Sequence, residues 1–189
     1  MNLHTDHRAL VAVAVVGFVT LTLIIGVLPA FEVQKTGPHP GAHAIEALEL
    51  RGRDLYLREG CGFCHTQFVR SLPVDEPYGR GSVAEDYALE DPPLLGTQRT
   101  GPDLANVGVR QPSELWNLIH LYNPRVVVPQ SVMPGYPWYF AEKDQAAPNE
   151  KVVALPAGYA PRGKVIVATE EAIALVRYLQ WLKQPDVDR

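Results

Sequence analysis

Residues 60–66 read GCGFCHT and hold the only two cysteines of the 189-residue chain, Cys61 and Cys64, with His65 directly after them. A structural zinc site needs four ligands, commonly supplied as two pairs, and the chain has no second cysteine pair. A thioredoxin-type redox pair belongs to a βαβ unit, whereas this pair follows a predicted helix. The spacing C-x-x-C-H is instead the attachment signature of c-type haem.

The haem interpretation has a chemical reason. Cys61 and Cys64 lie one turn apart, so both sulfurs can form thioethers with the two vinyl groups, while His65 is held under the ring to coordinate iron. The motif occurs once, so the sequence predicts one covalently bound haem c. Haem of this type is attached on the outer face of the energised membrane, which places the domain outside the cytoplasm.

A second axial ligand is expected from a loop well downstream of the motif. Histidine paired with methionine raises the potential of haem iron, and Met133 is the only methionine besides Met1. It lies in SVMPGYP, residues 131–137, a loop rich in Pro and Gly where a gap-filling core methionine is not expected. The alternative ligand is His120, on the Trp116 side of a predicted helix. The sequence favours Met133.

The segment RTGPDL, which begins at Arg99, is expected on the same side of the haem as His65. A carbonyl at Gly101 or Pro102 can accept the Nδ1 proton of that imidazole, as acceptors of metal-bound histidines do. Arg99 and Arg125 are expected to pair with the haem propionates. The alternative for both arginines is an ordinary surface charge.

The first part of the chain is predicted to cross a membrane once. From Ala9 to Leu28 it runs for 20 residues without a charge, enough at 1.5 Å per residue to span a hydrocarbon core of roughly 30 Å. A cleaved signal peptide is the alternative, but its apolar core is usually only about 7–15 residues long. We therefore expect an anchor over residues 1–31, a linker rich in Pro and Gly with plain surface histidines over 32–44, and one soluble domain over 45–189.

The soluble domain is predicted to be mainly helical with long loops. Helices are expected over residues 45–59, 112–122 and 169–183, and the only strand over 165–167. Gly52 inside the first helix costs about 1 kcal/mol relative to Ala, which indicates that another backbone approaches closely there. We therefore expect the first and last helices to cross, around a core that something else helps to fill.

An acidic segment follows the haem motif. Residues 74–91 hold six carboxylates against Arg80, in a chain whose net charge is −4. Two interpretations stay open: a solvated loop, or a docking face for a basic electron donor or a neighbouring subunit.

Two further segments carry a family resemblance. GRDLYLREGC at residues 52–61 and MPGYPW at 133–138 go beyond a generic haem motif. With them, residues 49–138 resemble the mono-haem, membrane-anchored cytochrome c subunit (subunit II) of cbb3-type cytochrome c oxidases. After Trp138 the resemblance ends, because segment 139–168 does not look like the usual oxidase subunit.

The resemblance implies a class I cytochrome c-like domain in which Cys61, Cys64 and His65 hold the haem and Met133 is the axial partner. Such a subunit has no catalytic site of its own and passes electrons to a haem-copper catalytic subunit, beside other cytochrome subunits in the lipid bilayer. Its haem domain would lie on the periplasmic side of a bacterial inner membrane. No nucleic acid is expected among the partners.

Three alternative functions remain. Similar single-haem anchored subunits serve haem-copper nitric oxide reductases, so the gas that is reduced stays open. A free-standing, membrane-tethered electron shuttle is the second alternative, although a linker of about 15 residues is short for such a role. A haem-based sensor, or an enzyme with an open iron site, is the third, and a bound Met133 would argue against it.

Overall fold

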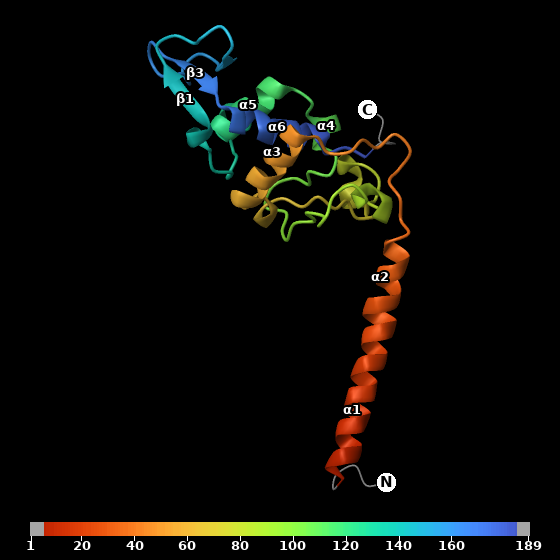
Figure 1. Ribbon diagram of the computed structural model, residues 1–189. Coiled ribbons are helices and arrows are strands. Elements are labelled where there is room, and N and C mark those ends of the chain that lie inside the picture. Colours follow the sequence, from red (N-terminus) through yellow and green to blue (C-terminus); the bar gives the residue numbers. More distant parts are fainter. Residues whose placement is uncertain (1–5, 185–189) are drawn as a thin grey trace.

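The computed structural model describes residues 6–184 and shows one long helix standing away from a globular domain (Figure 1). The outermost parts of the predicted anchor and of the predicted domain, residues 1–5 and 185–189, lie outside the described residues. About 46% of the chain is helical, which confirms the mainly helical class.

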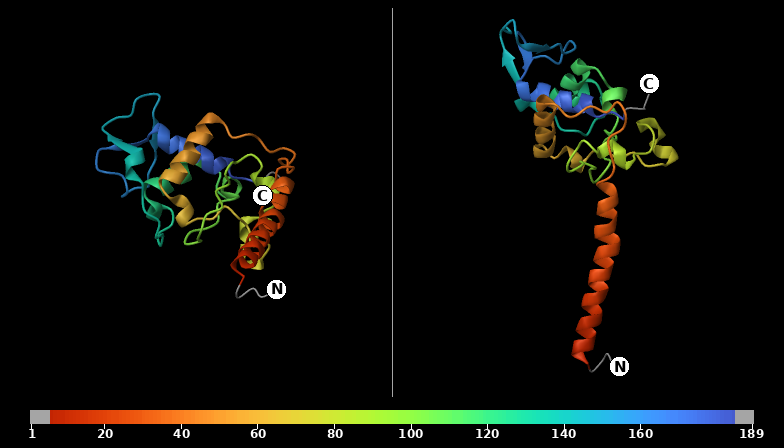
Figure 2. Two further views of the ribbon diagram at one scale, coloured as in Figure 1. Left: turned by 60° about the horizontal axis from the view of Figure 1, so that its bottom comes forward. Right: turned by 45° about the vertical axis from the view of Figure 1, so that its right-hand side comes forward.

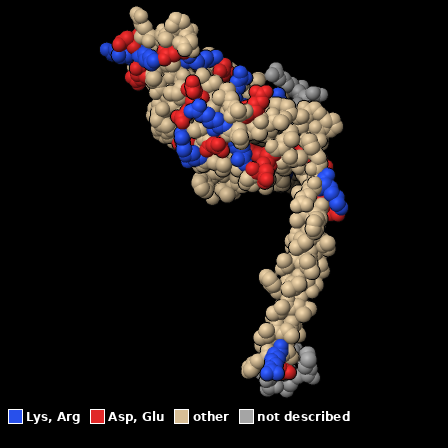
Figure 3. Space-filling model, viewed as in Figure 1, with Lys and Arg blue, Asp and Glu red and all other residues tan. Residues whose placement is uncertain are grey.

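The long helix is the predicted anchor. It consists of α1 (His7–Leu21), a π-helical stretch (Thr22–Val27) and α2 (Leu28–Val33). Asp6 caps its start by accepting hydrogen bonds from two backbone N–H groups at 3.1 Å. The 27 residues are long and apolar enough to cross a membrane, and the most apolar 18-residue stretch has a mean hydropathy of 2.8. None of that stretch is buried against the rest of the described residues. Charges appear on the helix only near its two ends (Figure 3).

The linker after the anchor lies against the domain. A ring nitrogen of His39, Nε2, is 3.3 Å from the Asp86 carboxylate, and Trp181 donates its indole N–H to the carbonyl of His43 at 3.2 Å. His39 is half-buried, whereas His43 is exposed and accepts this hydrogen bond through its backbone. The expectation that both are plain linker histidines stays a prediction. The short connection is held at two points.

Two helices cross at the centre of the domain, as predicted from Gly52. They are α3 (Ala47–Arg58) and α6 (Glu170–Trp181), which Thr169 caps through its side chain. A Cβ atom added at Gly52 would lie 2.0 Å from the carbonyl oxygen of Ala174 and 2.8 Å from Cβ of Tyr178. Only glycine lets the two helices come this close.

Two further helices pack beside α6. They are α4 (Val107–Arg110) and α5 (Glu114–Tyr122), the latter capped by Ser113, whose hydroxyl accepts a hydrogen bond from a backbone N–H at 3.2 Å. The core between these helices is apolar and aromatic, with fully buried Tyr56, Leu118, Leu175 and Tyr178. Figure 2 shows the crossing helices from two other sides.

A small antiparallel sheet follows the helices at the end of the domain that lies away from the anchor (Figures 1 and 2). Its strands are β1 (Phe140–Lys143), β2 (Lys151–Val153) and β3 (Val165–Ala168), in the order β1-β3-β2. The prediction of a single strand over 165–167 was wrong because β1 and β2 are too short to show an alternating pattern. They become strands by pairing with β3, as Phe140 does with Ala168.

The acidic segment is folded inward. It contains two short 3-10 turns, Pro73–Tyr78 and Ala84–Tyr87. Three of its six carboxylate side chains are buried, with exposures of 0% for Asp75, 7% for Asp86 and 4% for Glu90. Asp86 pairs with Arg80 at 2.6 Å and Glu90 with Arg53 at 2.9 Å. Half of the segment's negative charge therefore holds the fold together, so the segment is not simply a solvated loop. A docking face formed by its exposed carboxylates stays a prediction.

Candidate functional site

The cysteine motif forms a tight turn at the end of α3. Gly60 ends the helix with a φ of +69°, a left-handed conformation that favours glycine. The backbone N–H groups of Cys64 and His65 both donate to the carbonyl of Cys61, at 3.1 and 3.0 Å. The two thiols and the imidazole are thereby held within one turn of chain.

A pocket opens beside this turn. It has a cavity volume of about 120 Å³ and is partly open to solvent. The predicted residues Cys61, His65, Pro102 and Met133 all line it, while Cys64 is exposed. The structure thus brings together residues that are up to 72 positions apart in the chain.

Residues 101 and 102 fix the orientation of the His65 imidazole. Its Nδ1 lies 2.7 Å from the Pro102 carbonyl oxygen, as the sequence predicted for one of two carbonyls. A Cβ atom at Gly101 would lie 2.2 Å from Cε1 of the ring, so only glycine fits there. Burial lowers the pKa of His65, and the imidazole is therefore neutral at pH 7, the form that binds a metal.

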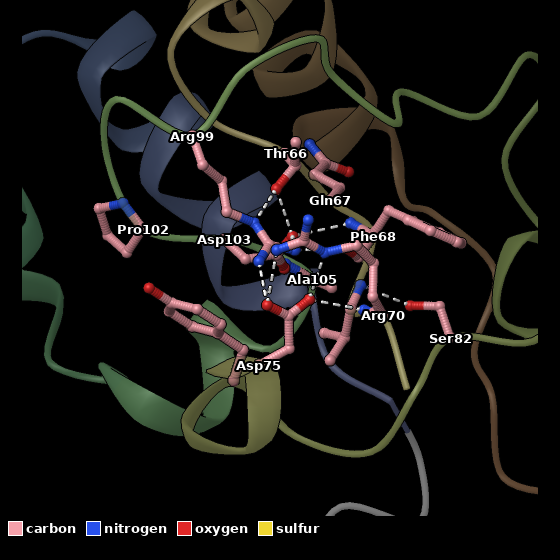
Figure 4. Close-up of polar contacts among 12 residues, drawn as sticks. Thr66, Gln67, Phe68, Arg70, Asp75, Ser82, Arg99, Pro102, Asp103 and Ala105 are labelled. Carbon is pink, nitrogen blue, oxygen red and sulfur yellow. Dashed lines mark hydrogen bonds and ion pairs between the residues drawn. The ribbon is translucent and has the colours of Figure 1, made fainter. Parts of the chain in front are cut away.

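A buried ion-pair network supports both chain segments around this imidazole (Figure 4). Arg99 donates from Nε to the Thr66 hydroxyl at 2.7 Å, from Nη2 to the Phe68 carbonyl at 2.7 Å and from Nη1 to Asp75. Asp103 accepts from the Thr66 hydroxyl at 2.6 Å and from the Phe68 N–H at 2.9 Å. The residues next to His65 are thus tied to the residues next to Pro102.

Asp75 completes this network from the acidic segment. Hydrogen bonds from Arg70 and then from Arg99 hold the pKa of the Asp75 carboxyl well below its usual range. Arg99 therefore has its donors engaged inside the network. Arg125, in contrast, is the exposed residue of the 3-10 turn Pro124–Val126.

The loop that carries Met133 is fastened to α5. The Tyr136 N–H donates to the Leu121 carbonyl at 2.8 Å, and a Cβ atom at Gly135 would lie 2.6 Å from the Tyr122 carbonyl oxygen. The thioether side chain is half-buried at the pocket. The alternative ligand His120 lines the same pocket, so both candidates face one cavity.

The residues at the pocket fit a haem better than a structural zinc site or a thioredoxin-type redox pair. Burial, followed by the charge of Glu59, raises the pKa of Cys61 to about 12, whereas redox-active thiols have a lowered pKa. Within residues 6–184 no three His, Cys, Asp or Glu side chains gather closely enough to hold a metal ion. A porphyrin brings four nitrogen ligands of its own and needs only one or two axial ligands from the protein.

Several pocket residues were missed from the sequence, among them Tyr56, Arg110 and Gln111. Nothing in the local pattern singles out one arginine among the others, and Arg110 reaches the pocket only because α4 packs on α6. A Cβ atom at Gly108 would lie 2.2 Å from the Gln180 carbonyl oxygen, which shows how closely the two helices approach.

Two comparisons with known proteins bear on this site. No curated protein was found that matches the chain. A family model described as "Cytochrome C oxidase, mono-heme subunit/FixO" matches residues 2–159, and this match includes the anchor, the cysteine motif and the Met133 loop.

Proposed function

The chain belongs to the family of mono-haem cytochrome c oxidase subunits, FixO, and from this premise we propose that it delivers electrons to the haem-copper catalytic subunit of a cbb3-type oxidase. Family membership implies one haem and an association with the catalytic subunit of a cytochrome c oxidase. The nitric oxide reductase and free-shuttle alternatives are not favoured by it.

In this proposal the domain is a class I cytochrome c-like fold that holds one haem c covalently. The bound haem supplies one-electron exchange. Cys61 and Cys64 would hold its vinyl edge, and His65 and Met133 would be the axial ligands. The observation that carries the proposal is the meeting of Cys61, His65 and Met133 at one pocket, with the Pro102 carbonyl in place to orient the imidazole.

The hydrogen bond from His65 to Pro102 has a chemical role in this proposal. An imidazole that donates its Nδ1 proton presents Nε2 as the free ligand atom, and the bond makes that nitrogen more basic. The network of Arg99 and Asp103 holds the Pro102 carbonyl and the His65 imidazole in their relative positions. The pairing of Arg99 and Arg125 with the haem propionates, predicted from the sequence, is not part of this proposal, because the donors of Arg99 are already engaged.

The proposed topology follows from the anchor and from the chemistry of haem attachment. We place the span of residues 1–31 in the bacterial inner membrane and the domain of residues 45–189 on its periplasmic side. The connecting residues 32–44 are the linker, in which His39 and His43 contact the domain. This short, fastened connection suits a fixed acceptor in the same membrane better than a roaming shuttle.

The test is purification from native membranes in mild detergent. The chain should co-purify with a haem-copper subunit, support oxygen turnover above nitric oxide turnover, and keep its haem stain on a denaturing gel. Cys61→Ala with Cys64→Ala should abolish the stain. Gly62→Ala is the matched control inside the same turn, because its new Cβ would meet only the Gly96 Cα atom, at 3.8 Å. Loss of haem from the native chain on denaturation contradicts the covalent attachment, and purification without a catalytic subunit contradicts the oxidase assignment.

A further inference from the structure

Part of the pocket lining is polar. Most of its lining is apolar, from Leu104 to Leu179, but the residues that α4 and α5 bring to it carry side-chain donors. They are Arg110, Gln111, Trp116, Asn117 and His120. The donors of Asn117 are already used, because its amide donates to the carbonyls of Gln111 and Ser113, each at 2.9 Å.

His120 has a buried ring nitrogen that lacks a partner. Its Nδ1 makes no hydrogen bond among the residues that the structure describes. The ring stacks on Trp116, with centroids 4.6 Å apart and planes 9° apart, which fixes its orientation. A buried polar atom without a partner costs free energy unless a ligand supplies one.

Arg110 lacks an anionic partner in the same pocket. Its guanidinium donates to the backbone carbonyl of Asp103 and stacks over the Tyr78 ring at 5.1 Å, but it forms no ion pair with a carboxylate between residues 6 and 184. Burial lowers the pKa of Arg110, in contrast to Arg99, whose pKa is raised by its hydrogen bond to Asp75. The Arg110 side chain is exposed at the pocket, and a guanidinium without a counter-charge can bind an anionic group there.

We propose that Arg110 and His120 bind the propionate carboxylates of the haem, and that they do so in place of Arg99 and Arg125. The inference rests on the proposed function, because it requires a haem in the pocket. The propionates are the only anionic groups at the rim of a haem, and they leave the porphyrin at the edge opposite its vinyl groups. Cysteines on one side of the pocket therefore need carboxylate-binding donors elsewhere in the lining. Among the described residues, Arg110 is the charged donor there, and His120 has the buried ring nitrogen without a partner.

The test uses the purified holoprotein in its reduced, diamagnetic form. Resonance Raman spectroscopy reports the propionate bending band, whose frequency falls when a hydrogen bond to the carboxylate is lost. Arg110→Gln should lower this frequency, and Arg110→Lys should restore part of it. His120→Phe keeps the stacking on Trp116 but removes the nitrogen, whereas His120→Asn places an amide near the position of Nδ1 and should rescue the band.

Nitrogen NMR of His120 supplies an independent readout. We expect a proton on Nδ1 that exchanges slowly with water in wild type and quickly in Arg110→Gln, where the carboxylate loses its second anchor. The controls are Arg125→Gln, the arginine expected from the sequence, and Arg162→Gln, an exposed arginine in the loop before β3. Neither should move the propionate band.

Three results would overturn the inference. One is an unchanged band in Arg110→Gln and His120→Phe, or in Arg110→Met and His120→Phe where the Gln variant does not fold. Another is a shift in Arg125→Gln alone, which would support the prediction from the sequence. The third is loss of the six-coordinate spectrum in His120→Phe, which would make His120 an iron ligand. Haem content is measured first on the wild-type protein, because a chain without haem would refute the proposed function itself.

Discussion

Replacing Gly52 by Ala tests the closest helix contact in the molecule. The new Cβ atom would lie 2.0 Å from the carbonyl oxygen of Ala174 and 2.7 Å from its carbonyl carbon, on the facing helix α6. Contacts shorter than 3.0 Å essentially do not occur for a Cβ atom, so the helices must separate by about 1 Å at the crossing. Both atoms belong to helical backbone, which cannot rotate away as a side chain would.

The expected loss of stability follows from two opposing effects. Inserting a methyl group into a packed core costs about 1–3 kcal/mol, and the upper end applies because backbone must move. Alanine gains about 1 kcal/mol over glycine inside a helix. The variant should therefore unfold with a free energy about 2 kcal/mol lower than wild type.

Urea unfolding of the detergent-solubilised holoprotein, followed by circular dichroism, measures this difference. Gly62→Ala is the control, because its Cβ atom meets a neighbour only at an ordinary distance of 3.8 Å. That variant should unfold near the wild-type midpoint. A Gly52→Ala protein as stable as wild type, or more stable, would refute the inferred contact and with it the crossing of α3 and α6 at this point.

Three further predictions concern the haem ligand, the ion-pair network and the linker. Met133→His should keep a six-coordinate iron but lower its midpoint potential in a redox titration, and an unchanged potential would point to another ligand. Two arginines lower the pKa of Asp75, so the stability that its carboxylate contributes is complete above its unfolded pKa of about 3.9 and is lost as the pH falls further. Asp75→Asn should therefore reduce the free energy of unfolding at pH 7 and make that free energy decline less steeply in acid. An unchanged acid slope would contradict this linkage. His39→Ala should release the linker from Asp86 and speed its cleavage by added protease, with domain stability measured alongside, and an unchanged cleavage rate would argue against the contact.

The helices could be predicted from the sequence because their signals are local. An apolar run of 20 residues identifies a membrane span, and Thr169 before Glu170 and Glu171 identifies the start of α6. Gly52 was informative for a different reason, since a glycine inside a helix needs a cause outside that helix. The strands β1 and β2 gave no such signal, because their pairing with β3 is long-range and neither is long enough to alternate clearly.

The site residues also divide into those with a local sequence signal and those whose partners are distant in the chain. Cys61, Cys64 and His65 form a contiguous motif, and Met133 stands out because the chain has so few methionines. The pocket places His65 and Met133 on one cavity, which no spacing rule could show. The roles of the arginines could not be predicted from the sequence, because the charge and the residue type do not indicate which carboxylate each arginine pairs with.

In the acidic segment, buried carboxylates determine which arginines form ion pairs within the protein. Asp75 lies in a 3-10 turn and still reaches Arg99, 24 residues later, to form a buried pair beside the residues that hold His65. A buried pair of this kind adds little net stability over apolar packing, but breaking it by removing one partner is costly. Arg99 is therefore committed to a charge inside the protein, while Arg110, which pairs with no carboxylate in the described part of the chain, is available to a carboxylate brought by the cofactor.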